Sequence, residues 1–268
     1  MGGPTRGRTL SGAYFEPVAD GLQPAPEARS PWAEDMLHGR FLSGLAARAV
    51  EAVEHDGAMR LARLTVDMFR SPPMTPFTTH ATITRGGRRV RVVEVSIRAG
   101  ELEVARATAL MLVTAAEPPG HVWHEPNWDA PPPESVPRPL EMGEMLGGWD
   151  IRVMNEGGFW SSERKRMWSR DVWALVDGEE SSPMVRAALA SDLPNPLANS
   201  SDQGLQYINP DLTLFIARPP VSEWVGLEVS QHIARDGIAV GSCTMYDTEG
   251  PIGQSTVTGI VNDVSLSS

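Results

Sequence analysis

Cysteine is nearly absent from this sequence: Cys243 is the one cysteine among 268 residues. A single cysteine cannot form a disulfide bond within the chain, and it excludes a metal site built from several thiolates. Its neighbours Thr244, Met245 and Tyr246 predict a strand. We therefore expect Cys243 to be a small buried residue and not a catalytic thiol.

The chain also lacks a run of about 18 apolar residues, which a membrane-spanning helix requires. Residues 1–11 lack the apolar core of a secretory signal, so we expect a cytoplasmic protein without membrane insertion. Basic residues are in deficit, because 23 Lys and Arg against 34 Asp and Glu give a formal net charge of -11. This balance argues against nucleic acid as a partner, since its phosphates are bound by clustered Lys and Arg.

Two catalytic patterns are missing as well. The six histidines show no metal-ligand spacing, so we expect no metal site and no bound cofactor. No Gly-x-Ser-x-Gly turn occurs, which argues against a serine hydrolase of the type that exposes its nucleophile on such an elbow.

What the sequence does contain is an internal repeat. Residues 64–72 and 212–220 both begin with Leu-Thr and end with an arginine followed by proline, and proline stops a strand because it cannot donate to a sheet ladder. A similar series of strand-like segments, joined by tight turns that contain glycine, follows each of them. These segments are 77–85, 90–97 and 102–113 in the first half, and 224–234, 238–246 and 252–261 in the second.

One helix precedes the strands of each half. Apolar residues recur at three- and four-residue intervals over 38–54, which predicts a helix with one buried face. Ser182 and Pro183 are a good N-cap and first residue for a shorter helix in the second half. One helix followed by an antiparallel meander indicates the α+β class. A long helix across a curved antiparallel sheet is the hotdog arrangement, so we expect a tandem (double) hotdog, with two antiparallel sheets each wrapped around a central helix.

A proline-rich segment separates the two halves. Eight prolines lie between Pro118 and Pro139, and such a composition is typical of a stiff extended linker. We therefore expect an N-terminal unit at 1–117, a linker at 118–148 and a C-terminal unit at 149–268. The linker contains Trp123 and Trp128, so part of it is expected to pack on the surface.

A series of short motifs runs through the chain. In the second half they are Gly157-Gly158-Phe159-Trp160, Trp173-Ala174-Leu175-Val176-Asp177-Gly178, Ala190-Ser191-Asp192, Asn209-Pro210-Asp211-Leu212-Thr213, Arg218-Pro219-Pro220, Glu223-Trp224-Val225, Asp236-Gly237, Tyr246-Asp247 and Gly250-Pro251-Ile252-Gly253; the first half adds Pro31-Trp32 and His38-Gly39. In this order and spacing they resemble the thioesterase-like superfamily, and in particular the TesB-like acyl-CoA thioesterases.

The resemblance implies hydrolysis of an acyl-CoA thioester by water, in a cleft where two hotdog units meet. Its active site combines an aspartate near the end of the second central helix, a Ser, Thr or Asn on the next strand, and a glutamine on the last strand. Asp192 matches the first position and is the expected base. Asn209 falls at the second position, with Thr213 four residues on along the same strand face.

The third position departs from the family pattern. Counted from Gly250, the expected glutamine falls on Val257 or Thr258, and Gln254 lies close by but misplaced. Gln254 and Thr258 share a strand face. We expect Thr258, with Asn209 and Thr213, to hold the water or the thioester carbonyl, and Gln254 to contact the substrate.

Three further residues are expected to contact the substrate or to support the local structure. His38 precedes Gly39 at the start of the first helix, where it either caps the helix or binds the ligand. Asp211 alternates with Leu212, so it is expected to face the same side as Asn209 and Thr213, unless it is a structural residue at the strand start.

Three hypotheses about function remain. The first is an acyl-CoA thioesterase of lipid metabolism that acts by Asp-assisted attack of water, with acyl-CoA as substrate. The second, favoured by the missing glutamine, is a catalytically weak acyl-CoA-binding or structural hotdog protein. The third is a hydratase or dehydratase, which needs a His-Asp pair that the sequence does not reveal. Hotdog units commonly associate through sheet edges or helix faces, so we expect a homo-oligomer.

Overall fold

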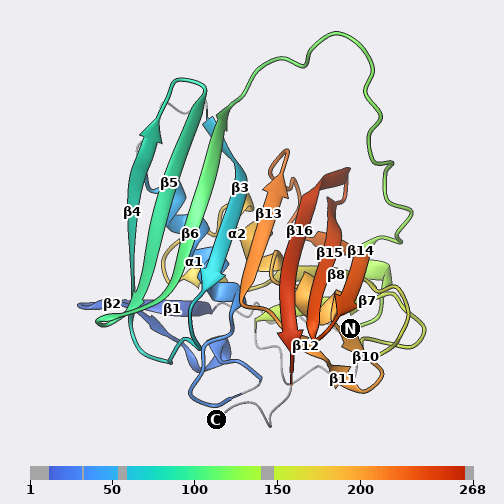
Figure 1. Ribbon diagram of the computed structural model, residues 1–268, viewed down its shortest axis with the longest axis horizontal. Coiled ribbons are helices and arrows are strands. Elements are labelled where there is room, and N and C mark those ends of the chain that lie inside the picture. Colours follow the sequence, from blue (N-terminus) through green and yellow to red (C-terminus); the bar gives the residue numbers. More distant parts are fainter. Residues whose placement is uncertain (1–11, 32, 54–58, 140–147, 263–268) are drawn as a thin grey trace, which may run out of the picture.

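The computed structural model of the chain describes residues 12–31, 33–53, 59–139 and 148–262. Trp32 of the Pro31-Trp32 motif, residues 1–11 and the last part of the expected linker lie outside the described residues. The described residues form few helices and many strands, as expected for the α+β class (Figure 1). None of the described helices is long and apolar enough to cross a membrane.

Among its described residues, the first half contains one central helix and a four-stranded antiparallel sheet whose last three strands form a meander. Its elements are β1 (Ala13–Val18), β2 (Gly21–Pro24), the 3-10 turn η1 (Pro26–Ala28), α1 (Arg40–Glu51), β3 (Met59–Met68), β4 (Phe77–Gly86), β5 (Val90–Ala99) and β6 (Leu102–Val113). The helix and the three strands predicted after residue 72 are confirmed. The apolar face of α1, which includes Phe41, Leu42 and Leu45, is fully buried against these strands.

The second half repeats the helix-then-meander order with additional short elements. They are η2 (Pro133–Ser135), β7 (Trp149–Val153), β8 (Arg166–Asp171), β9 (Ala174–Val176), α2 (Pro183–Ala190), α3 (Pro194–Ala198), β10 (Ser200–Ser201), β11 (Gly204–Leu205), β12 (Tyr207–Ile208), β13 (Asp211–Ile216), β14 (Val225–Arg235), β15 (Ile238–Asp247) and β16 (Gly250–Val261). The predicted cap of α2 is confirmed, since Ser182 Oγ accepts the Val185 N–H. Cys243 is buried on β15.

The meanders of the two halves join in one continuous sheet. Within the described residues its strands follow the order β7-β8-β14-β15-β16-β13-β3-β6-β5-β4-β2-β1-β9. The junction is an antiparallel pair between β3 and β13 that places Thr65 opposite Thr213. This differs from the expected two sheets, because two edge strands whose backbone groups would otherwise face water pair with each other.

The helices cover one face of this sheet, and in Figure 1 they lie behind it. There α1 packs against α2, and Gly44 lies at this contact: a Cβ on Gly44 would lie 2.6 Å from Leu189 Cδ2. The two halves also meet through β1, which pairs in parallel with β9. The helix from each half is therefore held beside the other, and residues at their ends come together.

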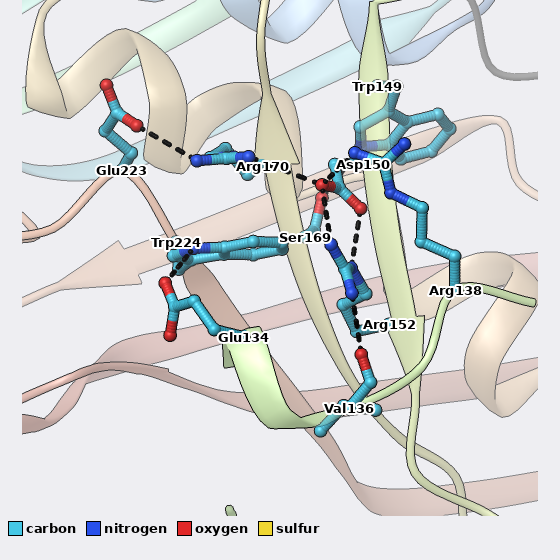
Figure 2. Close-up of polar contacts among 10 residues, drawn as sticks. All are labelled: Glu134, Val136, Arg138, Trp149, Asp150, Arg152, Ser169, Arg170, Glu223 and Trp224. Carbon is cyan, nitrogen blue, oxygen red and sulfur yellow. Dashed lines mark hydrogen bonds and ion pairs between the residues drawn. The ribbon is translucent and has the colours of Figure 1, made fainter. Parts of the chain in front are cut away.

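The second part of the proline-rich segment packs onto the sheet through tryptophans. Trp128 stacks on Tyr246, with ring centroids 4.7 Å apart. Trp224 Nε1 donates to Glu134 Oε1 at 3.1 Å (Figure 2). Trp123, in contrast, keeps 80% of its surface exposed. Of the two linker tryptophans, only Trp128 packs as the sequence suggested.

An arginine cluster fastens the end of the same segment to β7 and β8 (Figure 2). The buried carboxylate of Asp150 accepts hydrogen bonds from Arg138, Arg152 and Arg170, at 2.8, 2.7 and 3.3 Å. Burial by itself raises the pKa of Asp150, but the hydrogen bonds from Arg152 and Arg138 outweigh it and hold that pKa below its usual value. The cluster pairs one buried carboxylate with three arginines, and it holds Trp149, the neighbour of Asp150, beside Arg40 at the start of α1.

A candidate active site at the junction of the two halves

Asp192 lies in the short turn between α2 and α3, with 7% of its surface exposed. Its Oδ1 accepts a hydrogen bond of 2.8 Å from Asn209 Nδ2. Burial raises the pKa of Asp192, and the hydrogen bond from Asn209 and the charge of Arg40 oppose that rise in part. A buried carboxylate with a raised pKa is poised to take up a proton, which is the property a general base requires.

Three buried serines hold the turn that carries Asp192. Ser43 of α1 and Ser191 both donate to the carbonyl of Ala188, at 2.7 and 2.6 Å. Ser255 of β16 donates to the carbonyl of Ser191 at 2.6 Å. These carbonyls belong to the end of α2, where the regular backbone hydrogen bonds of the helix run out. The serines therefore fix the position of Asp192 relative to α1 and to β16.

The start of α1 faces the other oxygen of Asp192. His38 Nδ1 lies 3.9 Å from Asp192 Oδ2. A Cβ on Gly39 would lie 3.5 Å from the same oxygen and 3.5 Å from Met68 Sδ. Gly39 has a φ of -54°, which any residue adopts. Its missing side chain therefore matters here for the room that it leaves beside Asp192.

A buried ion pair underlies this part of the site and joins the two halves. Arg40 donates to both carboxylate oxygens of Asp171, at 3.1 and 2.6 Å, and Tyr14 donates to the same carboxylate at 2.9 Å. The guanidinium of Arg40 lies 4.2 Å from the ring centroid of Trp149. This pair could not be predicted from the sequence, because no local pattern connects the segments that contain Arg40 and Asp171.

The structure brings together Asp192, Asn209, His38 and Gly39, and it separates them from the remaining candidates. Asn209 was expected to share a strand face with Asp211 and Thr213. Instead β13 begins at Asp211, because Pro210 has no N–H to pair and interrupts the strand. Asn209 therefore turns toward Asp192, independently of the alternation that follows it.

Asp211, Thr213, Gln254 and Thr258 lie on the outer face of the sheet. Asp211 Oδ1 accepts from the N–H and the hydroxyl of Thr258, and the hydroxyl of Thr213 lies 3.1 Å from that of Thr65. Gln254 is exposed and its amide reaches Thr256, at 3.4 Å. The expectation that Thr213 or Thr258 holds a water beside Asp192 therefore differs from the structure.

The inward face of β16 carries Ser255 and Val257, both completely buried. Val257 is one of the two positions at which the family resemblance led us to expect glutamine. Its apolar side chain supplies no hydrogen bond to the site. The polar groups around Asp192 come instead from Asn209 and from the start of α1.

The third hypothesis, a hydratase or dehydratase, needs a His-Asp pair that the sequence does not reveal. The structure does bring such a pair together, since His38 and Asp192 face each other across the two halves. Sequence spacing could not reveal it, because the contact depends on how α1 packs beside α2. Within the described ranges, no three metal-binding side chains gather closely enough to hold a metal ion.

Comparisons with known proteins match this architecture. Residues 28–112 match the family model described as the acyl-CoA thioesterase N-terminal domain, and residues 116–261 match that of the acyl-CoA thioesterase C-terminal domain. None of the curated proteins compared with the chain matches it in sequence.

Solved structures are similar over most of the chain at low sequence identity. A protein of unknown function with a hot dog fold from Alicyclobacillus acidocaldarius has a TM-score of 0.72 at 16% identity, covering 90% of this chain and 92% of that one. The tesB protein of Mycobacterium avium subspecies paratuberculosis has 0.68 at 17%, covering 93% and 96%. The acyl-CoA thioesterase II TesB2 of Mycobacterium marinum has 0.64 at 18%, covering 84% and 91%. These likenesses show the hotdog fold.

Proposed function

Because this chain belongs to the acyl-CoA thioesterase family, whose two domain models it matches in order, we propose that it hydrolyses an acyl-CoA to a free acid and CoA. The observation that carries the proposal is the environment of Asp192. Its buried carboxylate has one oxygen bonded to Asn209 and the other facing the first turn of α1. That arrangement leaves Oδ2 to orient a water in the space beside Gly39.

In this mechanism Asp192 takes a proton from the water as the water oxygen attacks the thioester carbonyl carbon. The carbonyl oxygen becomes negatively charged, and the positive end of the α1 dipole stabilises it. The intermediate collapses, the carbon–sulfur bond breaks, and the CoA sulfur leaves with the proton that Asp192 holds. Asn209 keeps the carboxylate oriented throughout. Water is the co-substrate, and the proposal includes no metal and no bound cofactor.

The proposal extends to the organisation of the chain. The two halves are taken as hotdog units at 1–117 and 149–268, joined by the segment 118–148, with the site between them. The proposal also includes a cytoplasmic location and assembly of the chain into a homo-oligomer. The arrangement of α1 and of α2 with α3 on the sheet formed by β3 to β6 and β13 to β16 supports the tandem arrangement.

The test is release of free CoA from a panel of acyl-CoAs of increasing chain length. Wild type is compared with Asp192→Asn, which keeps the shape of the side chain but not the base. Asp211→Asn is the matched control, because Asp211 lies on the outer face of the sheet. Turnover in wild type and in the control, with loss in Asp192→Asn, supports the proposal.

Two other functions have an observation in their favour. The apolar Val257 on the inward face of β16 favours a weak acyl-CoA-binding protein, which would bind acyl-CoA without releasing CoA. The proximity of His38 to Asp192 favours a hydratase or dehydratase, which would interconvert an enoyl-CoA and a hydroxyacyl-CoA without releasing CoA. Binding measurements and the absorbance of an enoyl-CoA in the same assays separate these outcomes.

A further inference from the structure

His38 is held in one tautomer by a backbone hydrogen bond. The N–H of Arg40 donates to His38 Nδ1 at 3.3 Å. A backbone N–H can only donate, so Nδ1 carries no proton. In a neutral ring with an unprotonated Nδ1, the proton is on Nε2. His38 therefore has a fixed N–H donor on the side of the ring away from Arg40.

The position of the ring is fixed as firmly as its tautomer. The N–H of His38 donates to the carbonyl of Ala28 at 3.0 Å, and its carbonyl accepts from Phe41 at 3.1 Å. Trp149 and Phe41 meet the imidazole edge-on, with centroid distances of 5.9 and 6.4 Å. The side chain nevertheless keeps 23% of its surface exposed, so a bound molecule can reach it.

The surroundings of His38 also keep the ring neutral. Burial and the nearby charge of Arg40 lower the pKa of His38 to about 3, and the positive end of α1 acts in the same direction. The ring is thus a hydrogen-bond donor that does not ionise at physiological pH. Its Nδ1 lies 3.9 Å from Asp192 Oδ2, so the ring and the expected base are direct neighbours.

We infer that His38 is a second catalytic residue, whose Nε2–H donates to the carbonyl oxygen of the thioester while Asp192 acts on the water. This inference rests on the proposed function. As water adds to the carbonyl carbon, the π electrons move to the oxygen, and the neutral imidazole stabilises the resulting oxyanion without transferring a proton. When the carbon–sulfur bond breaks, the oxygen becomes a carbonyl again and the ring is unchanged.

The other side chains around Asp192 are occupied, which leaves this role to His38. Asn209 donates to Asp192 itself. On the inward face of β16, Ser255 donates to the carbonyl of Ser191 and Val257 is apolar. His38 is also unsuited to be the base, because its Nδ1 lone pair already accepts the Arg40 N–H.

The competing explanation is that His38 only caps α1, and two isosteric substitutions separate the two roles. His38→Asn keeps an acceptor at the place of Nδ1, where asparagine readily bonds the N–H two residues on, but it removes the Nε2–H. His38→Gln places an amide N–H at the distance of Nε2 and loses the cap. Steady-state hydrolysis of the preferred acyl-CoA and thermal unfolding are measured on the full chain for wild type and both variants.

We expect His38→Asn to unfold at the wild-type temperature yet to lose roughly 10²-fold in kcat, as for removal of one oxyanion donor, with KM changed far less. His38→Gln is expected to regain about tenfold over His38→Asn despite the lost cap. Wild-type kcat in His38→Asn, or no recovery in His38→Gln, overturns the inference while the thioesterase proposal stands. Failure of wild type to release CoA from any acyl-CoA overturns both.

Discussion

Asn209 Nδ2 donates to Oδ1 of Asp192 at 2.8 Å, and this bond connects the strand side of the site with the turn between α2 and α3. Asn209 donates as well to the carbonyl of Asp211, at 3.1 Å, which ties its amide to the start of β13. The bond to Asp192 favours the ionised carboxylate and opposes the effect of burial. Asn209 thus orients the expected base and also limits how far its pKa rises.

Removal of this bond should move the pH dependence of the reaction. In Asn209→Ala the pKa of Asp192 loses a contribution that lowers it, so the carboxylate becomes ionised only at higher pH. The acid limb of kcat/KM is therefore expected to shift to higher pH, with a lower kcat. Thr213→Ala, on the outer face of the sheet, is the control and should leave the limb in place. A limb that stays fixed or moves to lower pH in Asn209→Ala contradicts this role.

The burial of Asp192 should cost stability at neutral pH. Its folded pKa lies above the ordinary value of 3.8, so protonation favours the folded state and stability is lost as pH rises from 3.8 through the folded pKa. Asp192→Asn removes the buried charge and keeps an acceptor for Asn209. We expect a higher melting temperature than wild type at pH 7, with the difference shrinking in acid. Equal melting temperatures of wild type and Asp192→Asn at pH 7 would show that burial does not disfavour the ionised form of Asp192.

A substitution at Gly39 should impair turnover without destabilising the fold. In Gly39→Ala the added methyl lies 3.5 Å from Asp192 Oδ2, an ordinary contact, and the backbone conformation suits alanine. The free energy of unfolding is expected to change by less than about 1 kcal/mol. Turnover is expected to fall sharply, because the methyl occupies the space proposed for the water. Chemical denaturation measures the stability of the variant, and CoA release measures its turnover. A stable variant that is fully active refutes the prediction.

The Arg40–Asp171 ion pair should stabilise the folded protein only while both partners are present. In Asp171→Asn the guanidinium of Arg40 stays buried without its counter-charge, and breaking a buried pair in this way typically costs about 3–5 kcal/mol. Replacing both partners, as in Arg40→Met with Asp171→Leu, should cost less than the single change. Urea denaturation of the single and double variants measures the difference. A double variant that is less stable than Asp171→Asn would contradict this explanation.

Local sequence patterns were sufficient to predict the elements that build the site. The spacing of Phe41, Leu42 and Leu45 marked the helix, and the cap at Ser182 marked the next one, because both signals depend on a few neighbouring residues. The family resemblance singled out Asp192 for the same reason, as part of a short motif. These predictions rest on local geometry, which the tertiary structure preserves.

Contacts across the two halves could not be predicted in this way. The approach of His38 to Asp192 depends on the packing of α1 beside α2, and that packing depends on the absence of a side chain at Gly44. The face taken by Asn209 depends on Pro210, which interrupts the alternation that the sequence suggested. The sequence motifs therefore predict catalytic groups in the second half alone, whereas the structure places residues of both halves around Asp192.

The most direct test of the account is a single turnover with enzyme in excess over acyl-CoA, carried out in heavy-oxygen water. If Asp192 acts as a base on water, the first turnover places one heavy oxygen in the released acid and none in the peptide that contains Asp192. Mass spectrometry of both products measures this. An unlabelled acid together with a labelled Asp192 peptide would make Asp192 a nucleophile, and release of neither CoA nor acid would contradict the thioesterase function itself.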